Sequence, residues 1–356
     1  MEFGILFTSQ PNLELDRYPY ADLQARITGD IKLADRLGYD VAWLAEHHFS
    51  DTYGIMPDVM TFAAYLAPQT ENIQLGTGVV VLPLNNVVRV VENACFNDLL
   101  SGGRFRLGVG SGYRKYEFDG LGIDFDSRRD VQVEALEVLL KLFHDRRIAF
   151  DGAAVRSHIG DDYELFPHSV QKPHPPLYMA AGSEQSIAAA ARYGFALMLS
   201  SLPRIEVMAR QTAHYRELLE SPKVLYRDNP PRGDVLINRF IYVAESDSEA
   251  KADSEAGVLK HLAHIGGQGN YMTTVDSDTT GSSYDDLLGD VALHGSPDTV
   301  AAMLAEMAER TNMTGLILHY PPYYGPERIT RSLTLFAEEV MPRFRDATAE
   351  RGAAAG

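Results

Sequence analysis

Three titratable residues follow directly on an apolar run in "DVAWLAEHHF" (residues 40–49): Glu46, His47 and His48. Imidazole and carboxylate groups can hold or move protons near neutral pH. Adjacent residues point apart on an extended chain, and no second group with ligand spacing is evident, so we expect no metal here. Two interpretations remain open: an acid, base or hydrogen-bond donor, and a structural histidine with a satisfied hydrogen bond.

Two glycine-rich stretches follow along the chain. In "LGTGVVVLP", Gly76 and Gly78 permit either a close approach of the backbone or a tight bend. In "RFRLGVGSGY", Gly108, Gly110 and Gly112 alternate and would leave one strand face bare for a flat ligand. This pattern is not the dinucleotide-binding fingerprint, which needs a helix directly after the turn.

A third stretch, "YMAAGSEQSIAAAARYG", places Gly182 and Ser183 just before a predicted helix, with Ser186 one turn on. The free N–H groups and positive dipole end of a helix N-terminus favour a phosphate. Ser183 is equally suited to be an ordinary N-cap residue. Both interpretations stay open.

The elements that must position these residues alternate regularly along the chain. Apolar runs alternate with amphipathic helical patterns in eight strand-then-helix units, a pattern that predicts a parallel sheet covered by helices. At this length the eight units favour a TIM (β/α)8 barrel with insertions over an open sheet. The predicted strands are residues 2–8, 40–46, 73–83, 104–110, 176–182, 195–200, 234–244 and 314–320. Active sites of such barrels lie at the C-terminal ends of the strands, where the residues above fall.

The barrel is expected to be a single domain over residues 1–346, followed by a flexible tail at 347–356. Two segments interrupt the alternation. Arg147 to Pro175 predicts an irregular or hairpin insertion. Gly266 to His294 is rich in Gly, Ser, Thr and Asp, and we interpret it as a lid over the catalytic face.

The charge and the amino-acid composition limit the kinds of partner and compartment that suit this chain. The net charge is −17, from 32 basic and 49 acidic residues, which argues against nucleic acid and anionic membranes. The single cysteine, Cys95, allows no internal disulfide and suits a reducing cytoplasm, where we expect a buried structural thiol. From the polar start "MEFGILFTSQ" we expect no signal peptide, and we expect no membrane-spanning helix, because no apolar run approaches about 20 residues.

Taken together, the motifs resemble the bacterial luciferase-like, flavin-dependent monooxygenases. The resemblance rests on "AEHHF", "LGTGVVVLP", "GRFRLGVGSGY…DFDSR", "PLYMAAGSEQS", "GFALMLSS", "GSPDTVAAML" and "LTLFAEEVMPRFR". It covers about residues 1–200 and 291–346; between them only the order of elements matches. Each motif alone is weak, and their order along the chain is specific.

The resemblance implies reduced FMN, supplied by a separate flavin reductase, which reacts with O2 to give a flavin hydroperoxide that attacks a small organic substrate. It assigns the catalytic role to His47, with Glu46 and His48 as neighbours that orient or charge it. It also implies a non-proline cis peptide at Gly78–Val79 beside the flavin ring. A homodimer through the helices after strands two and three is implied as well.

For the remaining cofactor contacts, the resemblance implies that the backbone of Tyr113 faces the ring, and that Gly182, Ser183 and Ser186 form the phosphate-binding turn. Two positions depart from the luciferases, which carry a reactive cysteine where this chain has Gly110 and a phosphate-pairing arginine where it has Ser111. The missing cysteine weakens the expectation of light emission. The missing arginine leaves the phosphate without its usual partner, and Arg114 or Lys115 would have to take its place.

Two alternatives remain beside the monooxygenase. One is a deazaflavin-dependent oxidoreductase on a similar barrel, which transfers hydride and needs a basic groove for an acidic cofactor tail. The other is a flavin-binding protein without catalysis. The sequence identifies neither the substrate nor the type of oxygenation.

Overall fold

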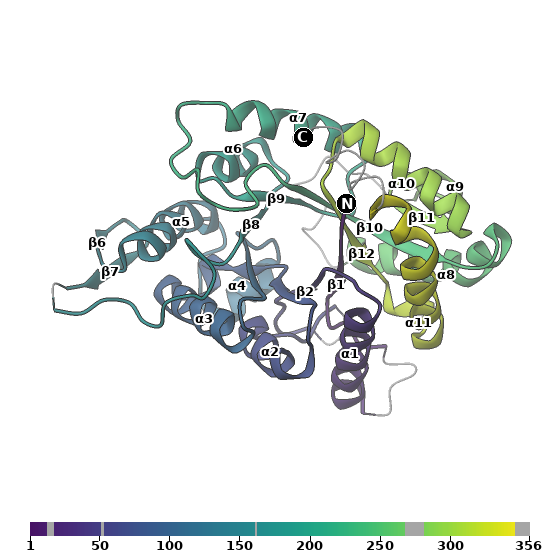
Figure 1. The fold of residues 1–356 in the computed structure, drawn as a ribbon, viewed down its shortest axis with the longest axis horizontal. Helices are drawn as coiled ribbons and strands as arrows, with labels where there is room; N and C mark the ends of the chain where they lie inside the picture. Colours follow the sequence, from purple (N-terminus) through teal and green to yellow (C-terminus); the bar gives the residue numbers. More distant parts are fainter. Residues whose placement is uncertain (13–17, 51–52, 161, 268–280, 346–356) are drawn as a thin grey trace.

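The protein, described here from a computed structural model, forms a closed parallel barrel wrapped by helices (Figure 1). The structure describes residues 1–12, 18–50, 53–160, 162–267 and 281–345. Strand β1 pairs with β2 on one side and β12 on the other, and β10 joins β12 to β9, which closes the ring. The barrel strands are β1 (Glu2–Phe7), β2 (Val41–Leu44), β3 (Gln74–Thr77), β5 (Phe105–Gly110), β8 (Leu177–Ala180), β9 (Ala196–Leu199), β10 (Val235–Val243) and β12 (Gly315–His319). The predicted TIM barrel is confirmed.

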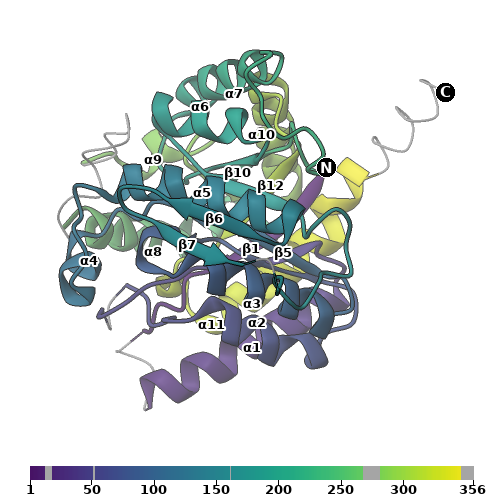
Figure 2. The same ribbon diagram turned by 90° about the vertical axis from the view of Figure 1, so that its left-hand side faces the viewer.

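Helices surround the barrel because each presents an apolar stripe to strands that are buried on both faces. In Figures 1 and 2, α6, α7 and α10 lie together on one side, and α1, α2 and α3 on the opposite side. The helices are α1 (Pro19–Arg36), α2 (Val59–Leu66), α3 (Val87–Leu100), α4 (Lys115–Leu121), α5 (Arg128–Asp145), α6 (Glu184–Arg192), α7 (Ile205–Leu219), α8 (Asp247–Gly267), α9 (Tyr284–Leu287), α10 (Pro297–Thr311) and α11 (Pro326–Leu335). Among the described residues, no helix combines the length and apolarity that a membrane crossing requires.

The segment from 147 to 175 contains an antiparallel hairpin, β6 (Ile148–Asp151) and β7 (Arg156–Ile159). Figure 1 shows this hairpin reaching outward beyond α5, and Figure 2 views the molecule from that side. Glu134 of α5 accepts backbone hydrogen bonds at 2.8–3.0 Å from the turn of the hairpin, which anchors it to the helix. Nothing of the hairpin lines the cavity described below.

The segment predicted as a lid falls partly outside the described residues, at 268–280. Its described part contains α9 and the short strand β11 (Ala292–Gly295), which pairs in parallel with the C-terminal half of β10. The tail at 347–356 also lies outside the described residues. The remaining short strand, β4 (Val80–Val81), extends the line of β3 and pairs with β5.

Two barrel glycines, Gly76 and Gly108, make room for other groups of the protein. A Cβ at Gly76 of β3 would clash with the indole of Trp43, which fills the barrel interior beside Tyr178. A Cβ at Gly108 of β5 would clash with the carbonyl oxygen of Thr77. The expected bare glycine face is therefore used, at Gly108, to bring neighbouring strands together.

Candidate active site

A cavity of about 270 Å³ opens at the C-terminal ends of the barrel strands, and we call it the barrel cavity. Barrel enzymes hold their active sites at this end. Most residues that the sequence analysis proposed for catalysis or cofactor binding line it; His48, Gly108, Arg114 and Lys115 do not. The proposed residues that line it are Glu46, His47, Gly78, Val79, Gly110, Ser111, Tyr113, Gly182, Ser183 and Ser186. Residues from four strand ends, those of β2, β3, β5 and β8, thus converge, as the order of elements predicted.

His47 is held by a carboxylate that the sequence analysis missed. Its Nδ1–H donates to Oε1 of Glu117 across 3.0 Å, and both side chains are almost fully buried. The backbone N–H of His48 donates to the same oxygen at 3.1 Å. Because Glu117 engages Nδ1, the Nε2 atom of His47 is the ring nitrogen left for a ligand in the cavity. The only signal for Glu117 in the sequence was an acidic residue just after the glycine-rich strand.

Glu46 and His48 pair with each other. Nε2 of His48 lies 3.0 Å from Oε1 of Glu46, and this hydrogen bond raises the pKa of His48 above its usual value. The carboxylate of Glu46 also accepts from the backbone N–H of Val81 at 3.0 Å and from Nδ2 of Asn85 at 3.1 Å. Glu46 therefore ties the segment after β2 to the segment after β3, and it is Glu117 that directly orients His47.

An aromatic cluster stands beside His47. The ring of Tyr53 meets the imidazole edge-on at a centroid distance of 4.6 Å, and its hydroxyl lies 2.8 Å from that of Tyr113. The buried guanidinium of Arg114 lies 4.0 Å from the Tyr53 ring centroid, a cation–π contact. Lys115 forms an exposed ion pair with Asp119. Neither Arg114 nor Lys115 lines the barrel cavity, so the expectation that one of them reaches a phosphate there is not supported.

Near the start of α6, Ser183 and Ser186 form a capping box. The backbone N–H of Ser186 donates to Oγ of Ser183 at 3.2 Å, and the N–H of Ser183 donates to Oγ of Ser186 at 3.0 Å. The N-cap interpretation of Ser183 is therefore correct as local structure. A Cβ at Gly182 would meet nothing within 4 Å, so the cavity is open beside this turn.

Two arginines that the sequence analysis did not select also line the barrel cavity. Arg128 and Arg129 begin α5, and both reach the same cavity as the α6 start. Cations at a helix N-terminus face the positive end of the dipole, so a pair of arginines there is unfavourable for the helix itself. That mismatch was the available signal for a role of these arginines beyond the helix itself.

The opposite wall carries two buried polar groups without partners among the described residues. His319 ends β12, and both of its ring nitrogens lack a hydrogen bond; Oδ1 of Asn238 on β10 lacks one as well. Burial lowers the pKa of His319 to about 4, so its imidazole is neutral at pH 7 and offers one donor and one acceptor. Ile317, Met198 and Ile265 make the surrounding wall apolar.

The peptide bond between Gly78 and Val79 is cis, as the resemblance implied. Both residues line the barrel cavity next to Gly110, where an added Cβ would lie 2.8 Å from Cγ2 of Val79. A side chain at position 110, such as the cysteine of the luciferases, would press on Val79. Glycine therefore leaves this part of the wall flat.

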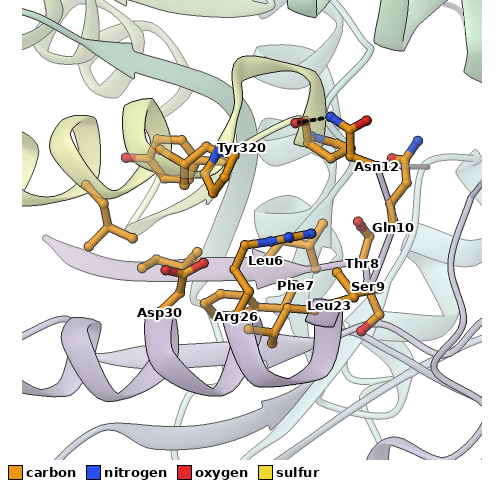
Figure 3. A pocket seen from close by; sticks show the side chains of 16 residues that line it. Leu6, Phe7, Thr8, Ser9, Gln10, Asn12, Leu23, Arg26, Asp30 and Tyr320 are labelled. Carbon is orange, nitrogen blue, oxygen red and sulfur yellow. Dashed lines mark hydrogen bonds between the residues drawn. The ribbon is translucent and has the colours of Figure 1, made fainter. Parts of the chain in front are cut away.

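A second, smaller cavity of about 70 Å³ lies between β1, α1 and the segment after β12 (Figure 3). Asp30 and Arg26 project from α1 toward Leu6 and Tyr320. Burial raises the pKa of Asp30 to about 6, only partly offset by the positive charge of Arg26. None of the residues proposed for catalysis or cofactor binding lines this cavity.

Residues 1–314 match the sequence family described as luciferase-like monooxygenase. The chain belongs to this family. The resemblance drawn from its motifs is thereby confirmed.

Within the luciferase-like family, two relatives illustrate the range. The uncharacterized protein y4vJ of Sinorhizobium fredii is 35% identical over 175 residues, which are 48% of this chain and 47% of that protein. The chain thus spans about half the length of this curated relative. The 4-hydroxyprotoasukamycin monooxygenase of Streptomyces nodosus subsp. asukaensis is 28% identical over 88% of this chain and 86% of its own.

Solved structures share the fold. The monooxygenase RslO1 of Streptomyces bottropensis superposes with a TM-score of 0.80 at 24% identity, over 97% of this chain and all of that chain. The oxygenating constituent of 3,6-diketocamphane monooxygenase from Pseudomonas putida, solved with FMN, gives 0.77 at 20%, over 96% and 98%. The coenzyme F420-dependent tetrahydromethanopterin reductase of Methanopyrus kandleri gives 0.69 at 18%, over 97% and 99%. One barrel thus serves both flavin and deazaflavin proteins.

Proposed function

We propose that this chain is a two-component, FMN-dependent monooxygenase. It would take reduced FMN from a separate flavin reductase and use O2 to oxygenate a small organic molecule. One oxygen atom would enter the substrate and the other leave as water, with two electrons from the reduced flavin. The observation that carries the proposal is His47, which is fixed by Glu117 in the wall of a cavity that has a flat side and two arginines in its lining.

The described residues fit a flavin mononucleotide. Gly78, Val79 and Gly110 give a flat wall for a planar ring, and the cavity is open at Gly182 for the chain that follows it. Arg128 and Arg129 would hold the phosphate together with the positive end of α6. These arginines replace the cationic partner that the luciferases carry at the position of Ser111. When bound, reduced FMN would supply the electrons that activate O2.

The role of His47 follows from its hydrogen bond. With Nδ1–H committed to Glu117, Nε2 can give a proton to, or take one from, a group in the cavity. The same hydrogen bond fixes the tautomer and the orientation of the ring, as a general acid or base requires. A positioned acid or base of this kind typically contributes a rate factor of about 10²–10⁴. Glu117, and the Glu46–His48 pair behind it, would act as positioning residues.

The wall formed by Asn238, His319 and Ile317 supports a small substrate that is mostly apolar and carries a polar group. Buried polar atoms without partners are costly, and a ligand that supplies the missing hydrogen bonds recovers that cost. His319 would offer either a donor or an acceptor there, and Oδ1 of Asn238 an acceptor.

The test is anaerobic binding of reduced FMN, followed by rapid mixing with oxygenated buffer while the absorbance of oxidised flavin is followed. We expect the protein to bind one equivalent and to change the oxidation rate relative to free reduced FMN. His47→Ala should bind the flavin and alter that rate, whereas His48→Gln should have a smaller effect, because His48 does not line the cavity. Oxidation at the rate of free flavin would rule the proposal out. Tight binding without oxygenation of any compound in a substrate panel would favour a flavin-binding protein without catalysis.

A deazaflavin-dependent oxidoreductase is the second candidate, because Arg128 and Arg129 supply a positive charge that an acidic cofactor tail also requires. The same titration with reduced F420 separates the two. Tighter binding of F420 than of FMN, with hydride transfer in the absence of O2, would replace the first proposal by the second.

We also propose a homodimer through α2 and α3. Four large apolar side chains on these helices are exposed: Tyr65, Phe96, Leu99 and Leu100 are 42–54% accessible. An exposed apolar patch of this kind is typical of a protein interface. The two helices contact each other, which supports a single interface across both.

A further inference from the structure

We propose that His144, His174 and Asp228 form a binding site for a divalent cation of the zinc class at the N-terminal end of the barrel. His144 lies in the last turn of α5, His174 three residues before β8, and Asp228 between α7 and β10. One nitrogen of each histidine and one carboxylate oxygen lie within 4.8 Å of one another. None of the three lines the barrel cavity, so this site is separate from the proposed active site.

His174 is prepared as a ligand. Its side chain is 1% exposed, and Nδ1–H donates to the carbonyl oxygen of Pro175 at 2.8 Å. This bond fixes the tautomer and leaves the lone pair on Nε2, which is buried and has no partner among the described residues. A histidine that binds a metal typically donates its other N–H to a backbone carbonyl in this way.

His144 and Asp228 complete the group. Nδ1 of His144 lies 3.6 Å from Oδ2 of Asp228, too far for a hydrogen bond but close to the separation of about 3.4 Å that two ligands adopt on a tetrahedral zinc. Nε2 of His144 is buried without a partner among the described residues. The ring stacks on Tyr226 with centroids 5.1 Å apart, which holds its orientation.

The ligand set defines the class of cation. Two imidazoles and one carboxylate suit Zn²⁺ and its neighbours in the first transition row better than Ca²⁺ or Mg²⁺, which prefer oxygen. Asp228 is half-exposed and supplies a negative charge, an entry route and access for a water as the fourth ligand. Sequence spacing could not reveal this group, because its members are 30 and 54 residues apart along the chain, from 174 − 144 and 228 − 174.

A bound cation would join the end of α5 to the segments that lead into β8 and β10. Because the ligands come together only in the folded chain, binding would stabilise the fold. The site therefore predicts a rise in melting temperature with Zn²⁺ that does not depend on flavin.

The experiment uses the full chain without an affinity tag, stripped with a chelator and titrated with ZnCl2 by calorimetry at neutral pH. Co²⁺ serves as a spectroscopic probe of the coordination. We expect one equivalent of Zn²⁺, the visible bands of four-coordinate Co²⁺, and a higher melting temperature. Asp228→Asn and His144→Gln should each weaken binding about tenfold or more. Both residues are partly exposed, so the metal-free variants should melt close to the wild type.

His158→Gln, at an exposed histidine of the hairpin, is the matched control and should bind like the wild type. Failure of the wild type to bind either metal would overturn the proposal. So would unchanged binding by both variants, because the metal would then lie elsewhere, for example near His47. Neither result bears on the flavin experiment above.

Discussion

Nδ1 of His47 lies 3.0 Å from Oε1 of Glu117, so a carboxylate of α4 fixes the imidazole that follows β2. The two residues are separated by 70 positions in the sequence. The same oxygen accepts the backbone N–H of His48, so one side chain sets both the ring and the loop that carries it. The consequences of this relationship can be measured.

Replacing Glu117 by Gln should lower oxygenation turnover about 10- to 100-fold with little loss of flavin affinity. The amide can still accept from Nδ1–H, but a neutral hydrogen bond is weaker than one to a carboxylate and holds the imidazole less firmly. Asp119→Asn, an exposed change on the same helix, is the control and should leave turnover unchanged. Equal turnover in both variants would show that Glu117 only supports the fold.

Arg128→Gln and Arg129→Gln should each raise the dissociation constant of reduced FMN about tenfold. Riboflavin has no phosphate, so its binding should not change in either variant. Anaerobic fluorescence titration of both ligands makes the comparison, with Arg156→Gln on the hairpin as the control. Equal losses for FMN and riboflavin would mean that the arginines shape the cavity without binding the phosphate.

Placing a charge on the exposed face of α3 should dissociate the proposed dimer. Phe96→Glu and Leu100→Glu put a carboxylate where the side chains are 51% and 48% exposed, so the fold should tolerate them. Burying that charge in an interface would be unfavourable. Light scattering after gel filtration should show a monomer for both variants and a dimer for the wild type. Leu225→Glu, equally exposed elsewhere, should remain dimeric; a monomeric wild type would reject the interface.

Asp30→Asn should stabilise the protein above pH 7 and have no effect near pH 3. Burial raises the pKa of Asp30 in the folded chain from 3.8 to about 6, so the folded state binds the proton more tightly than the unfolded state. The stability from the protonated form is complete below 3.8 and is lost as pH rises through about 6.

Asparagine cannot ionise and therefore avoids this loss. We expect the free energy of unfolding to rise by about 1–2 kcal/mol at pH 8. This is less than the whole pKa shift implies, because Asp30 keeps some solvent contact. Urea unfolding at pH 4, 6 and 8 measures the gain. Asp162→Asn, at an exposed site, should show no trend. An equal increase in the free energy of unfolding at all three pH values would show that the effect does not come from ionisation of Asp30.

The sequence by itself determined the barrel and the end of it that carries the candidate site. Uninterrupted apolar strands alternating with amphipathic helices leave few packings other than a parallel barrel. In a parallel barrel all strand ends of one kind meet at the same face, so Glu46, Gly110 and Ser183 had to converge. These inferences rest on local periodicity, which each segment displays without its neighbours.

Only the tertiary structure decided which side chains meet at each point. The hydrogen bond between His47 and Glu117 joins distant segments, and Asn238 and His319 line the same cavity from different strands; no local pattern encodes either arrangement. The glycines show the same limit of sequence reasoning. The sequence indicated that something could approach the backbone at Gly76 closely, but only the structure shows that this group is the indole of Trp43. Side-chain partners depend on distances across the barrel, and those distances are fixed only when all the strands have closed into one ring.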